Sequence, residues 1–290
     1  MDIRRSNMSV NHVAFSFILA LAGNAPAADA SAATWKAEKG GHYEIYLCAG
    51  QSNMDGRAPA KGLSGTLAHY AQPQQDVLIL HSSNGLHRKL RESPGIITLR
   101  PGCSESPASF GPELSFGRAL TDARKGKKLI LVKVTEGGTN LYADWNPDAL
   151  NQLYARLLLN VRKTQKILEG AGATSEIVGM IWMQGESDSD TQQWGKYQER
   201  LTAFIDRVRT DLKVENMPFV IGQICAANPA YQKIIAAQKA VAQNVPGTAI
   251  ASSAGLKTSD KNVHFDAPSQ IELGKRFATE LLKLMKLHEG

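Results

Sequence analysis

The sequence is poor in cysteine, in long apolar runs and in low-complexity segments. Only three of its 290 residues are cysteines, which is too few for a disulfide framework and leaves at least one thiol unpaired. No apolar run approaches the roughly 20 residues that a membrane-spanning helix needs, so a polytopic membrane protein is excluded. With 43% hydrophobic and 21% charged residues, the composition is that of an ordinary globular protein.

The N-terminus has the three parts of an export signal. They are a basic start (Arg4, Arg5), an apolar core of ten residues (Val13–Ala22), and small residues with cleavage sites after Ala27 or Ala30. The apolar core is too short to span a bilayer. We therefore predict that residues 1–30 are a cleaved signal peptide and that the mature protein is exported, to the periplasm or out of the cell, without stable membrane insertion.

The three cysteines carry little information about function. Cys48 lies in an apolar run that predicts a strand, and is most simply a small buried hydrophobic residue. A single Cys103–Cys225 bridge is compatible with an exported chain.

The chain is basic, with a net charge of +6, and the predicted signal peptide contributes none of it. The one local cluster, Arg124 to Lys128, falls at the end of a predicted helix, where cations interact favourably with the helix dipole. No basic stripe is interleaved with aromatic residues, as binding of single-stranded nucleic acid requires. We expect no nucleic-acid partner.

Short apolar runs alternate with longer amphipathic segments, which indicates an α/β fold with a central parallel sheet covered by helices on both faces. The predicted strands are Ile45–Ala49, Val77–His81, Leu129–Val134, Val178–Met183, Phe219–Ile224 and Thr248–Ala251. The predicted helices are Pro112–Arg124, Ala149–Glu169, Gln192–Leu212, Tyr231–Gln243 and Pro268–Leu287. No linker or repeat divides residues 31–290, so we predict a single domain.

Two segments, 57–75 and 82–111, are too long for ordinary connections and are predicted to be loops. In an open parallel sheet, long loops commonly gather at the carboxyl ends of the strands, where ligands bind. Plain surface decoration is the alternative interpretation.

Chemically distinctive residues follow several predicted strands directly. Ser52 comes after the first strand, at a strand-to-helix junction with free backbone N–H groups. The other segments are Glu136-Gly137-Gly138-Thr139, Trp182-Met183-Gln184-Gly185-Glu186-Ser187-Asp188, and Asp260-Lys261-Asn262-Val263-His264 ahead of the last helix. A serine, an imidazole, carboxylates and close-approach glycines at one edge are the parts of a serine hydrolase. Taken alone, a serine after a strand is usually just a helix N-cap.

Taken in order, these segments resemble the SGNH hydrolase superfamily. The matching segments are Gly50-Gln51-Ser52-Asn53-Met54, Phe110-Gly111-Pro112-Glu113, Gly137-Gly138-Thr139, residues 182–188 and residues 260–266. Within the superfamily, the chain is similar to the group of carbohydrate esterase family six acetyl xylan esterases and sialate O-acetylesterases. Its length, without additional domains, fits the acetyl xylan esterase type better.

The resemblance implies a flavodoxin-like three-layer α/β/α sandwich and hydrolysis of acetyl esters on carbohydrate, such as acetylated xylan, without metal or other cofactor. Ser52 would be the nucleophile and His264 the general base. The oxyanion hole would combine the backbone N–H groups of Ser52 and Gly138 with the side chain of Gln184.

One departure concerns the acid of the triad. The family's acid commonly stands three residues before its histidine, where this chain has Lys261, whereas Asp260 stands four before. We predict that a bulge in the loop lets Asp260 reach His264. Glu186 or Asp188 could orient the imidazole instead, or the dyad could work without an acid. Glu186 could also hold the loops together without touching substrate.

Further side chains have two interpretations each. Trp182 is expected in the core, whereas Trp145 could either stack on a sugar ring or pack under a helix. Asp266 is expected to cap the last helix. A carbohydrate-binding relative without catalysis, and a lipase-like or thioesterase enzyme, are the alternative functions. The sequence does not reveal the oligomeric state.

Overall fold

The computed structural model describes residues 35–84, 90–149, 152–189, 192–261 and 263–289. The predicted signal peptide, residues 1–30, lies outside the described residues.

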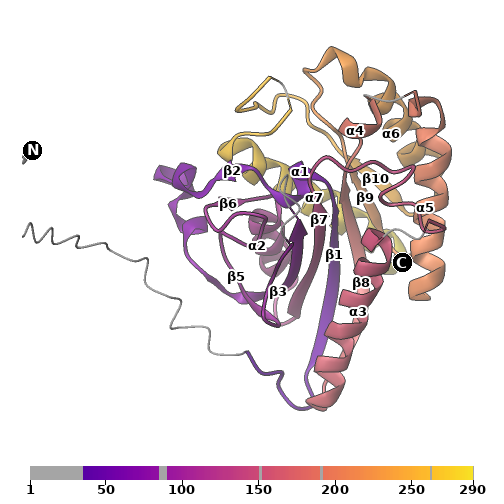
Figure 1. Cartoon of the computed structure of the whole chain (residues 1–290). Helices are drawn as coiled ribbons and strands as arrows, with labels where there is room; N and C mark the ends of the chain where they lie inside the picture. The colour runs from indigo at the N-terminus through magenta and orange to yellow at the C-terminus, as the bar shows by residue number, and fades with distance from the viewer. Residues whose placement is uncertain (1–34, 85–89, 150–151, 190–191, 262, 290) are drawn as a thin grey trace, which may run out of the picture. The chain divides into compact units, whose positions relative to one another are not determined.

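Six strands among the described residues run parallel in one sheet (Figure 1). They are β1 (His42–Gly50), β3 (Gln74–Asn84), β7 (Lys128–Glu136), β8 (Thr174–Met183), β9 (Phe219–Gly222) and β10 (Thr248–Ala251). Each contains most or all of a predicted strand, because nearly continuous apolar runs suit strands that are covered on both faces. β1 lies in the middle, paired over its length with β7 on one side and β8 on the other.

The strand order differs from the predicted flavodoxin-like order, in which the second strand lies beside the first. Here the order is β10-β9-β8-β1-β7-β3, so the third parallel strand, β7, separates β1 from β3. The long connection of residues 51–73 carries the chain past one strand position before β3 begins. The α/β class is therefore confirmed, and the flavodoxin-like order is not.

The sheet is also mixed, because the two segments predicted to be loops contain short strands. β4 (Leu90–Glu92) and β5 (Ile97–Leu99) pair antiparallel with β3. β2 (Ala58–Pro59) and β6 (Ser109–Phe110) form a separate two-stranded ladder. β3 is the last strand of the parallel set, so β4 and β5 satisfy backbone groups that would otherwise be an open edge.

Helices cover both faces of the sheet (Figure 1). The α-helices are α1 (Ser52–Asp55), α2 (Glu113–Ala123), α3 (Gln152–Gly170), α4 (Glu186–Ser189), α5 (Tyr197–Leu212), α6 (Gln232–Asn244) and α7 (Ala267–Glu289). The 3₁₀ helices are η1 (Ala60–Gly62), η2 (Gly65–Ala71), η3 (Trp194–Lys196) and η4 (Pro229–Tyr231). α2 and α7 pack together on one face. On the other, Trp182 of β8 packs against Phe204 of α5, with ring centroids 4.6 Å apart, beside α3 and α6.

The start of α7 shows how the sequence sets a helix boundary next to the site. The side chain of Asp266 accepts a hydrogen bond from the Ser269 N–H at 2.9 Å, which satisfies one of the first free donors of the helix. The predicted cap is confirmed. Because this cap fixes the first turn of α7, it also fixes where the preceding segment with His264 must end.

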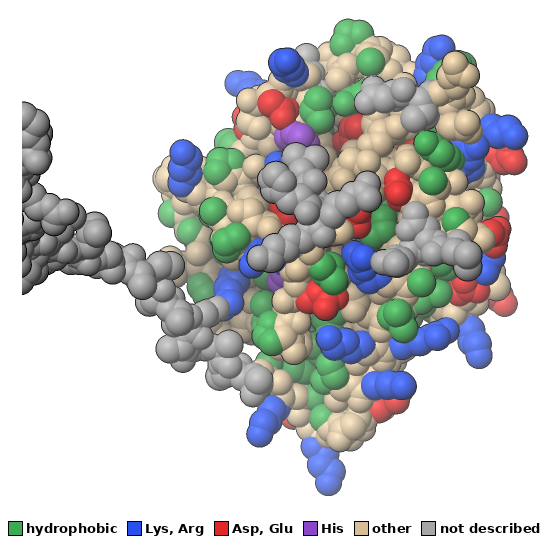
Figure 2. All heavy atoms as spheres, viewed as in Figure 1, with side chains coloured by type: hydrophobic (Ala, Val, Ile, Leu, Met, Phe, Trp, Pro, Cys, Tyr) green, Lys and Arg blue, Asp and Glu red, His purple; other side chains and the backbone are tan. Residues whose placement is uncertain are grey.

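All three cysteines are buried and unpaired, so the Cys103–Cys225 bridge that the sequence allowed is not formed. No described helix is both long enough and apolar enough to cross a membrane. Figure 2 shows Lys and Arg side chains scattered among acidic ones over the visible face rather than gathered in a single stripe.

Candidate active site

Ser52 is the first residue of α1, directly beyond the carboxyl end of the central strand β1. The sharp turn at this point requires glycine at position 50. Gly50 has a φ of +144°, which residues with side chains disfavour, and a Cβ there would overlap the carbonyl oxygen of Met183. The N–H groups of Met54 and Asp55 both donate to the Gln51 carbonyl at 2.9 Å, which closes the turn. The glycine before the serine motif thus permits both the turn and the close approach of β8.

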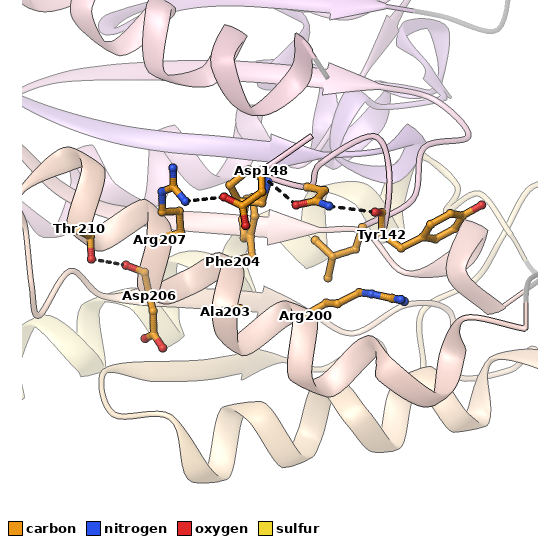
Figure 3. A pocket seen from close by; sticks show the side chains of 11 residues that line it. Tyr142, Asp148, Arg200, Ala203, Phe204, Asp206, Arg207 and Thr210 are labelled. Carbon is orange, nitrogen blue, oxygen red and sulfur yellow. Dashed lines mark hydrogen bonds and ion pairs between the residues drawn. The ribbon is translucent and has the colours of Figure 1, made fainter. Parts of the chain in front are cut away.

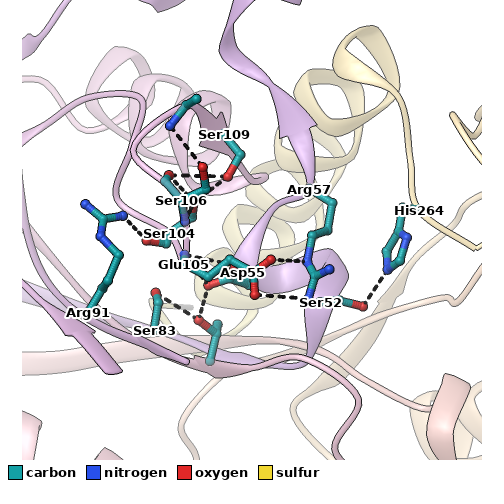
Figure 4. Close-up of polar contacts among 12 residues, drawn as sticks. Ser52, Asp55, Arg57, Ser83, Arg91, Ser104, Glu105, Ser106, Ser109 and His264 are labelled. Carbon is teal, nitrogen blue, oxygen red and sulfur yellow. Dashed lines mark hydrogen bonds and ion pairs between the residues drawn. The ribbon is translucent and has the colours of Figure 1, made fainter. Parts of the chain in front are cut away.

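The structure brings together the predicted serine, histidine and aspartate (Figure 4 shows the first two). His264 Nε2 lies 3.1 Å from Ser52 Oγ, and His264 Nδ1 lies 2.5 Å from Asp260 Oδ2. Ser52 is 3% exposed and the His264 side chain 22%, so the serine is buried and the imidazole is partly exposed. A hydroxyl, an imidazole and a carboxylate in this order can remove a proton from serine and hold the resulting imidazolium.

The spacing of four residues between Asp260 and His264 is accommodated by a turn. The carboxylate of Asp260 accepts the backbone N–H of His264 at 2.7 Å, and its carbonyl accepts the N–H of Val263 at 3.1 Å. Partial burial alone would raise the pKa of Asp260, but the hydrogen bonds from the backbone and ring of His264 hold it below its usual range. Asp260 is therefore in contact with the imidazole and ionised at neutral pH.

Two backbone N–H groups are available beside Ser52. Within the described part of the chain, neither the N–H of Ser52 nor that of Gly138 has an acceptor. A Cβ placed on Gly137 would lie 3.8 Å from Cβ of Ser52, so the two-glycine turn packs directly against the nucleophile position. Gly138 has a φ of +73°, which favours glycine and turns the loop at this point. Free N–H groups in such a place can bind an oxyanion.

The side-chain amide of Gln184, which was expected to donate to an oxyanion, donates to groups inside the protein instead. Its side chain is fully buried, and Nε2 donates to Asp188 Oδ2 at 2.6 Å, to the Thr139 carbonyl at 3.1 Å and to Gln51 Oε1 at 3.2 Å. Both of its N–H groups are thus directed at acceptors within the protein. In this conformation Gln184 links the serine and glycine segments, and the two backbone N–H groups remain as the candidate oxyanion donors.

Asn53 was not singled out from the sequence, although it follows Ser52 directly. Its buried side chain accepts the N–H of Phe265 at 3.2 Å and donates to the carbonyl of Val263 at 2.9 Å and to Glu186 Oε1 at 2.7 Å. Glu186 contacts Asn53, and no hydrogen bond joins it to His264; Asp260 is the carboxylate at the ring. Its place in the serine motif was the only sequence signal for Asn53.

Lys133 is a second buried residue near the site that the sequence analysis did not single out. It is fully buried in β7, and its ammonium donates to the carbonyls of Asp55 and Cys103 at 2.7 and 2.8 Å and pairs with Glu113 at 3.0 Å. It therefore joins the end of α1, the segment before β6 and the start of α2. A lysine inside an otherwise apolar strand was the available signal.

The far side of Ser52 is held by polar contacts as well (Figure 4). Asp55 accepts the hydroxyl of Thr135 at 2.7 Å and the N–H of Glu105 at 3.1 Å. The Glu105 carboxylate pairs with Arg57 through two guanidinium nitrogens at 2.7 and 3.0 Å. α1 is thus fixed on both sides, by β7 and by the segment before β6.

Trp145 is a core residue and not a sugar-stacking platform. It is fully buried, with its ring centroid 5.0 Å from that of Trp182, and its indole N–H donates to Thr139 Oγ1 at 3.1 Å. This corrects the sugar-ring alternative and supports the helix-packing one. The indole instead stabilises the loop that carries the two glycines.

A cavity of about 470 Å³ lies between the end of this loop and α5 (Figure 3). Arg200 lies over the ring of Tyr142, 5.6 Å from its centroid, and Arg207 pairs with Asp148 at 2.8 Å across the opening. Its lining residues do not include the serine, histidine or aspartate of the site. Elsewhere in the described ranges, no group of three or more His, Cys, Asp or Glu side chains could hold a metal ion.

The fold and the geometry around Ser52 have the features of a serine hydrolase: a serine hydroxyl at the carboxyl edge of a parallel sheet, with an imidazole, a carboxylate and free N–H groups in reach. Residues 42–283 match the family model described as carbohydrate esterase, sialic acid-specific acetylesterase. The chain belongs to this family and is a carboxylic ester hydrolase that acts on carbohydrate. No curated protein shows significant similarity to it.

Three solved structures have a similar fold at low sequence identity. A protein from Arabidopsis thaliana (21% identity, TM-score 0.64) covers 83% of this chain, which spans 98% of that protein. NanS (16%, 0.64) covers 86%, and this chain spans 99% of it. A carbohydrate acetylesterase from Xanthomonas citri (18%, 0.59) covers 83%, and this chain spans 56% of it. At these identities the likeness concerns the fold.

Proposed function

We propose that the protein is a serine esterase that removes O-acetyl groups from sugars through an acetyl-enzyme intermediate. The observation that carries the proposal is the continuous chain of contacts from Ser52 Oγ to His264 and from His264 to Asp260, at 3.1 and 2.5 Å. The family supports an ester of a carbohydrate as substrate. Ser52 is buried and the imidazole of His264 beside it is partly exposed, which suits a small acyl group on a hydrophilic molecule.

In the proposed first step, Ser52 Oγ attacks the acetyl carbonyl carbon while His264 Nε2 takes the hydroxyl proton. The N–H groups of Ser52 and Gly138 bind the oxygen as it becomes negative. The tetrahedral intermediate then expels the sugar oxygen, which receives the proton from His264. A water molecule repeats the sequence on acetyl-Ser52 and releases acetate. Asp260 orients the ring and stabilises its charged form.

The sugar itself is the finer part of the proposal. Membership of a sialic acid-specific acetylesterase family favours an acetylated sialic acid. The motifs singled out in the sequence are also compatible with the acetyl xylan esterase type that the sequence analysis preferred. Acetylated sialic acid and acetylated xylan both carry O-acetyl esters of secondary or primary sugar hydroxyls, so the same arrangement of Ser52, His264 and Asp260 could act on either substrate.

The test is acetate release by the purified mature protein from acetylated sialic acid, acetylated xylan and an aryl acetate. Ser52→Ala should abolish release, with a loss approaching roughly 10⁶-fold for a triad nucleophile. Release from one sugar only identifies the substrate class. No release by folded wild-type protein from any of the three would overturn the proposal in favour of a carbohydrate-binding protein.

The predicted export is proposed on the sequence alone. Intact-mass measurement on protein expressed with its full N-terminus should show a chain that begins at Ala28 or Ser31, according to which predicted site is cut. A mass equal to that of the full chain, with the protein retained in the cytoplasm, would contradict it.

A further inference from the structure

We propose that Glu186 is a positioning residue of this site, which acts through Asn53 to hold the His264 segment in register with Ser52. This inference rests on the proposed function and adds to it a residue that lies outside the serine–histidine–aspartate chain. Asn53 lies in α1 and Glu186 in α4, the helices that follow β1 and β8, and the two side chains meet in a buried position.

Asn53 contacts both neighbours of His264. Its Oδ1 accepts the N–H of Phe265 at 3.2 Å, and its Nδ2 donates to the carbonyl of Val263 at 2.9 Å. The residues on either side of the imidazole are therefore attached to the residue that follows the nucleophile. Any shift of this amide changes the distance between Ser52 and His264, which is 3.1 Å.

Glu186 adds a third contact to the two that orient the Asn53 amide. The second N–H of Nδ2 donates to Glu186 Oε1 at 2.7 Å, the shortest of the three contacts. A rotation of the amide by 180° would direct its oxygen at the Val263 carbonyl and at Glu186, and its NH₂ group at the Phe265 N–H. Three hydrogen bonds would become three repulsive contacts.

The contact requires an acceptor and not a negative charge. Glu186 is 4% exposed, and among the described residues its Oε2 has no hydrogen-bond partner. Burial, together with a smaller effect of the nearby Asp188 carboxylate, raises the pKa of Glu186 to about 7 despite the lowering effect of the Asn53 hydrogen bond. A neutral glutamine at this position still offers Oε1 to Asn53, whereas alanine offers nothing.

The first experiment measures aryl acetate hydrolysis by Glu186→Ala, Glu186→Gln and Asn53→Asp. Because a misplaced catalytic group costs roughly 10²-fold per ångström, Glu186→Ala should lower kcat by about 10- to 100-fold with little change in KM. Glu186→Gln should stay within about threefold of wild type. Asn53→Asp is nearly isosteric but cannot donate, and should lose at least as much as Glu186→Ala. Wild-type kcat in Glu186→Ala, or an equal loss in Glu186→Gln, would overturn the proposal.

The second experiment reports the contact itself and does not need activity. Hydrogen exchange of the Phe265 amide should be slow in wild type and in Glu186→Gln, and faster by about tenfold or more in Glu186→Ala. The Leu47 amide in the middle of β1 should exchange equally in all three proteins. Unchanged Phe265 exchange in Glu186→Ala would contradict the proposal even if the protein hydrolysed no ester.

A matched control separates this effect from the loss of any glutamate. Glu176 lies at the opposite end of β8, with 53% of its side chain exposed, so Glu176→Ala should leave kcat and Phe265 exchange unchanged. The failure of the two proposals is distinguishable. An inactive wild type, or full activity in Ser52→Ala, refutes the esterase mechanism, and unchanged Phe265 exchange refutes the positioning role.

Discussion

Asp260 shows how far a single side chain can be assigned from its contacts. The sequence analysis left three carboxylates open as partners of His264, since spacing alone does not decide which one reaches the ring. In the structure, Asp260 Oδ2 lies 2.5 Å from the ring, Glu186 bonds to Asn53, and Asp188 accepts from Gln184 and from the Leu141 N–H. A single turn makes the four-residue spacing work.

We expect Asp260→Asn to lower kcat for ester hydrolysis by about 10⁴-fold, because asparagine favours the wrong tautomer of the imidazole. Asp260→Ala should cost more turnover than Glu186→Ala, since only Asp260 contacts the ring. Steady-state kinetics with an aryl acetate checks both. The reverse order would make Glu186 the acid.

Glu186 also affects how stability depends on pH. Its pKa is raised from 4.5 to about 7, mainly by burial. Between these values the unfolded chain releases a proton that the folded protein keeps, so stability falls as pH rises through this range. Glutamine cannot ionise and removes the effect.

The expected result is that raising the pH from 5 to 8 costs wild type on the order of 3 kcal/mol more than it costs Glu186→Gln, at about 1.4 kcal/mol per pKa unit. Urea unfolding at the two pH values measures the difference. Parallel pH dependence in the two proteins would show that Glu186 ionises normally.

The elements around the site are joined by one buried cation. Lys133 uses its three N–H groups on three acceptors, from the end of α1, from the segment before β6 and from Glu113 at the start of α2. The sequence contained a signal for this residue, since a lysine interrupts the apolar run of β7. It did not reveal the partners, because Asp55, Cys103 and Glu113 lie 20 to 78 positions away.

Lys133→Met should destabilise the fold by about 3–5 kcal/mol, because it leaves the Glu113 carboxylate buried without its counter-charge. The double variant Lys133→Met with Glu113→Leu should recover part of that loss, since no unpaired charge remains. Denaturant titration of the three proteins tests this. A loss below about 1 kcal/mol in the single variant would contradict the role of the pair.

Local pattern and long-range pairing were predictable to different degrees. Each parallel strand and most helices followed from apolar periodicity, which depends on neighbouring residues. β4, β5 and the β2–β6 ladder did not, because strands of two or three residues are too short to show periodicity. β4 and β5 form by pairing with β3, and β2 and β6 form by pairing with each other. The segments judged to be loops therefore contain the antiparallel part of the sheet.

At the scale of the whole molecule, the sequence indicated which residues meet at one edge of the sheet but not the order of the strands. Ser52, His264, Asp260 and Gly138 all lie at the carboxyl edge, as any arrangement of parallel strands requires. The insertion of β7 between β1 and β3 depends on which strand pairs with which over more than 40 residues, and no local signal encodes it. Gln184 is at the expected edge but faces inward.

The whole fold is held without disulfides, which gives a prediction about redox conditions. Cys48, Cys103 and Cys225 are buried and free, and burial raises the pKa of the Cys103 thiol to about 11. We expect the same Tm with and without a reducing agent, and reaction of three thiols with a disulfide reagent only after unfolding. A Tm that falls on reduction would reveal a bridge.

The turn from Asp260 to His264 has a further consequence, for protein engineering. Asp260 and His264 lie on one short segment, and the hydrogen bonds between them fix their relative position. The rest of the protein then has to set only the position of this segment relative to Ser52. Loops near the site can be exchanged in directed evolution without rebuilding the Asp260–His264 pair, provided that the contacts of this segment with Asn53 are kept.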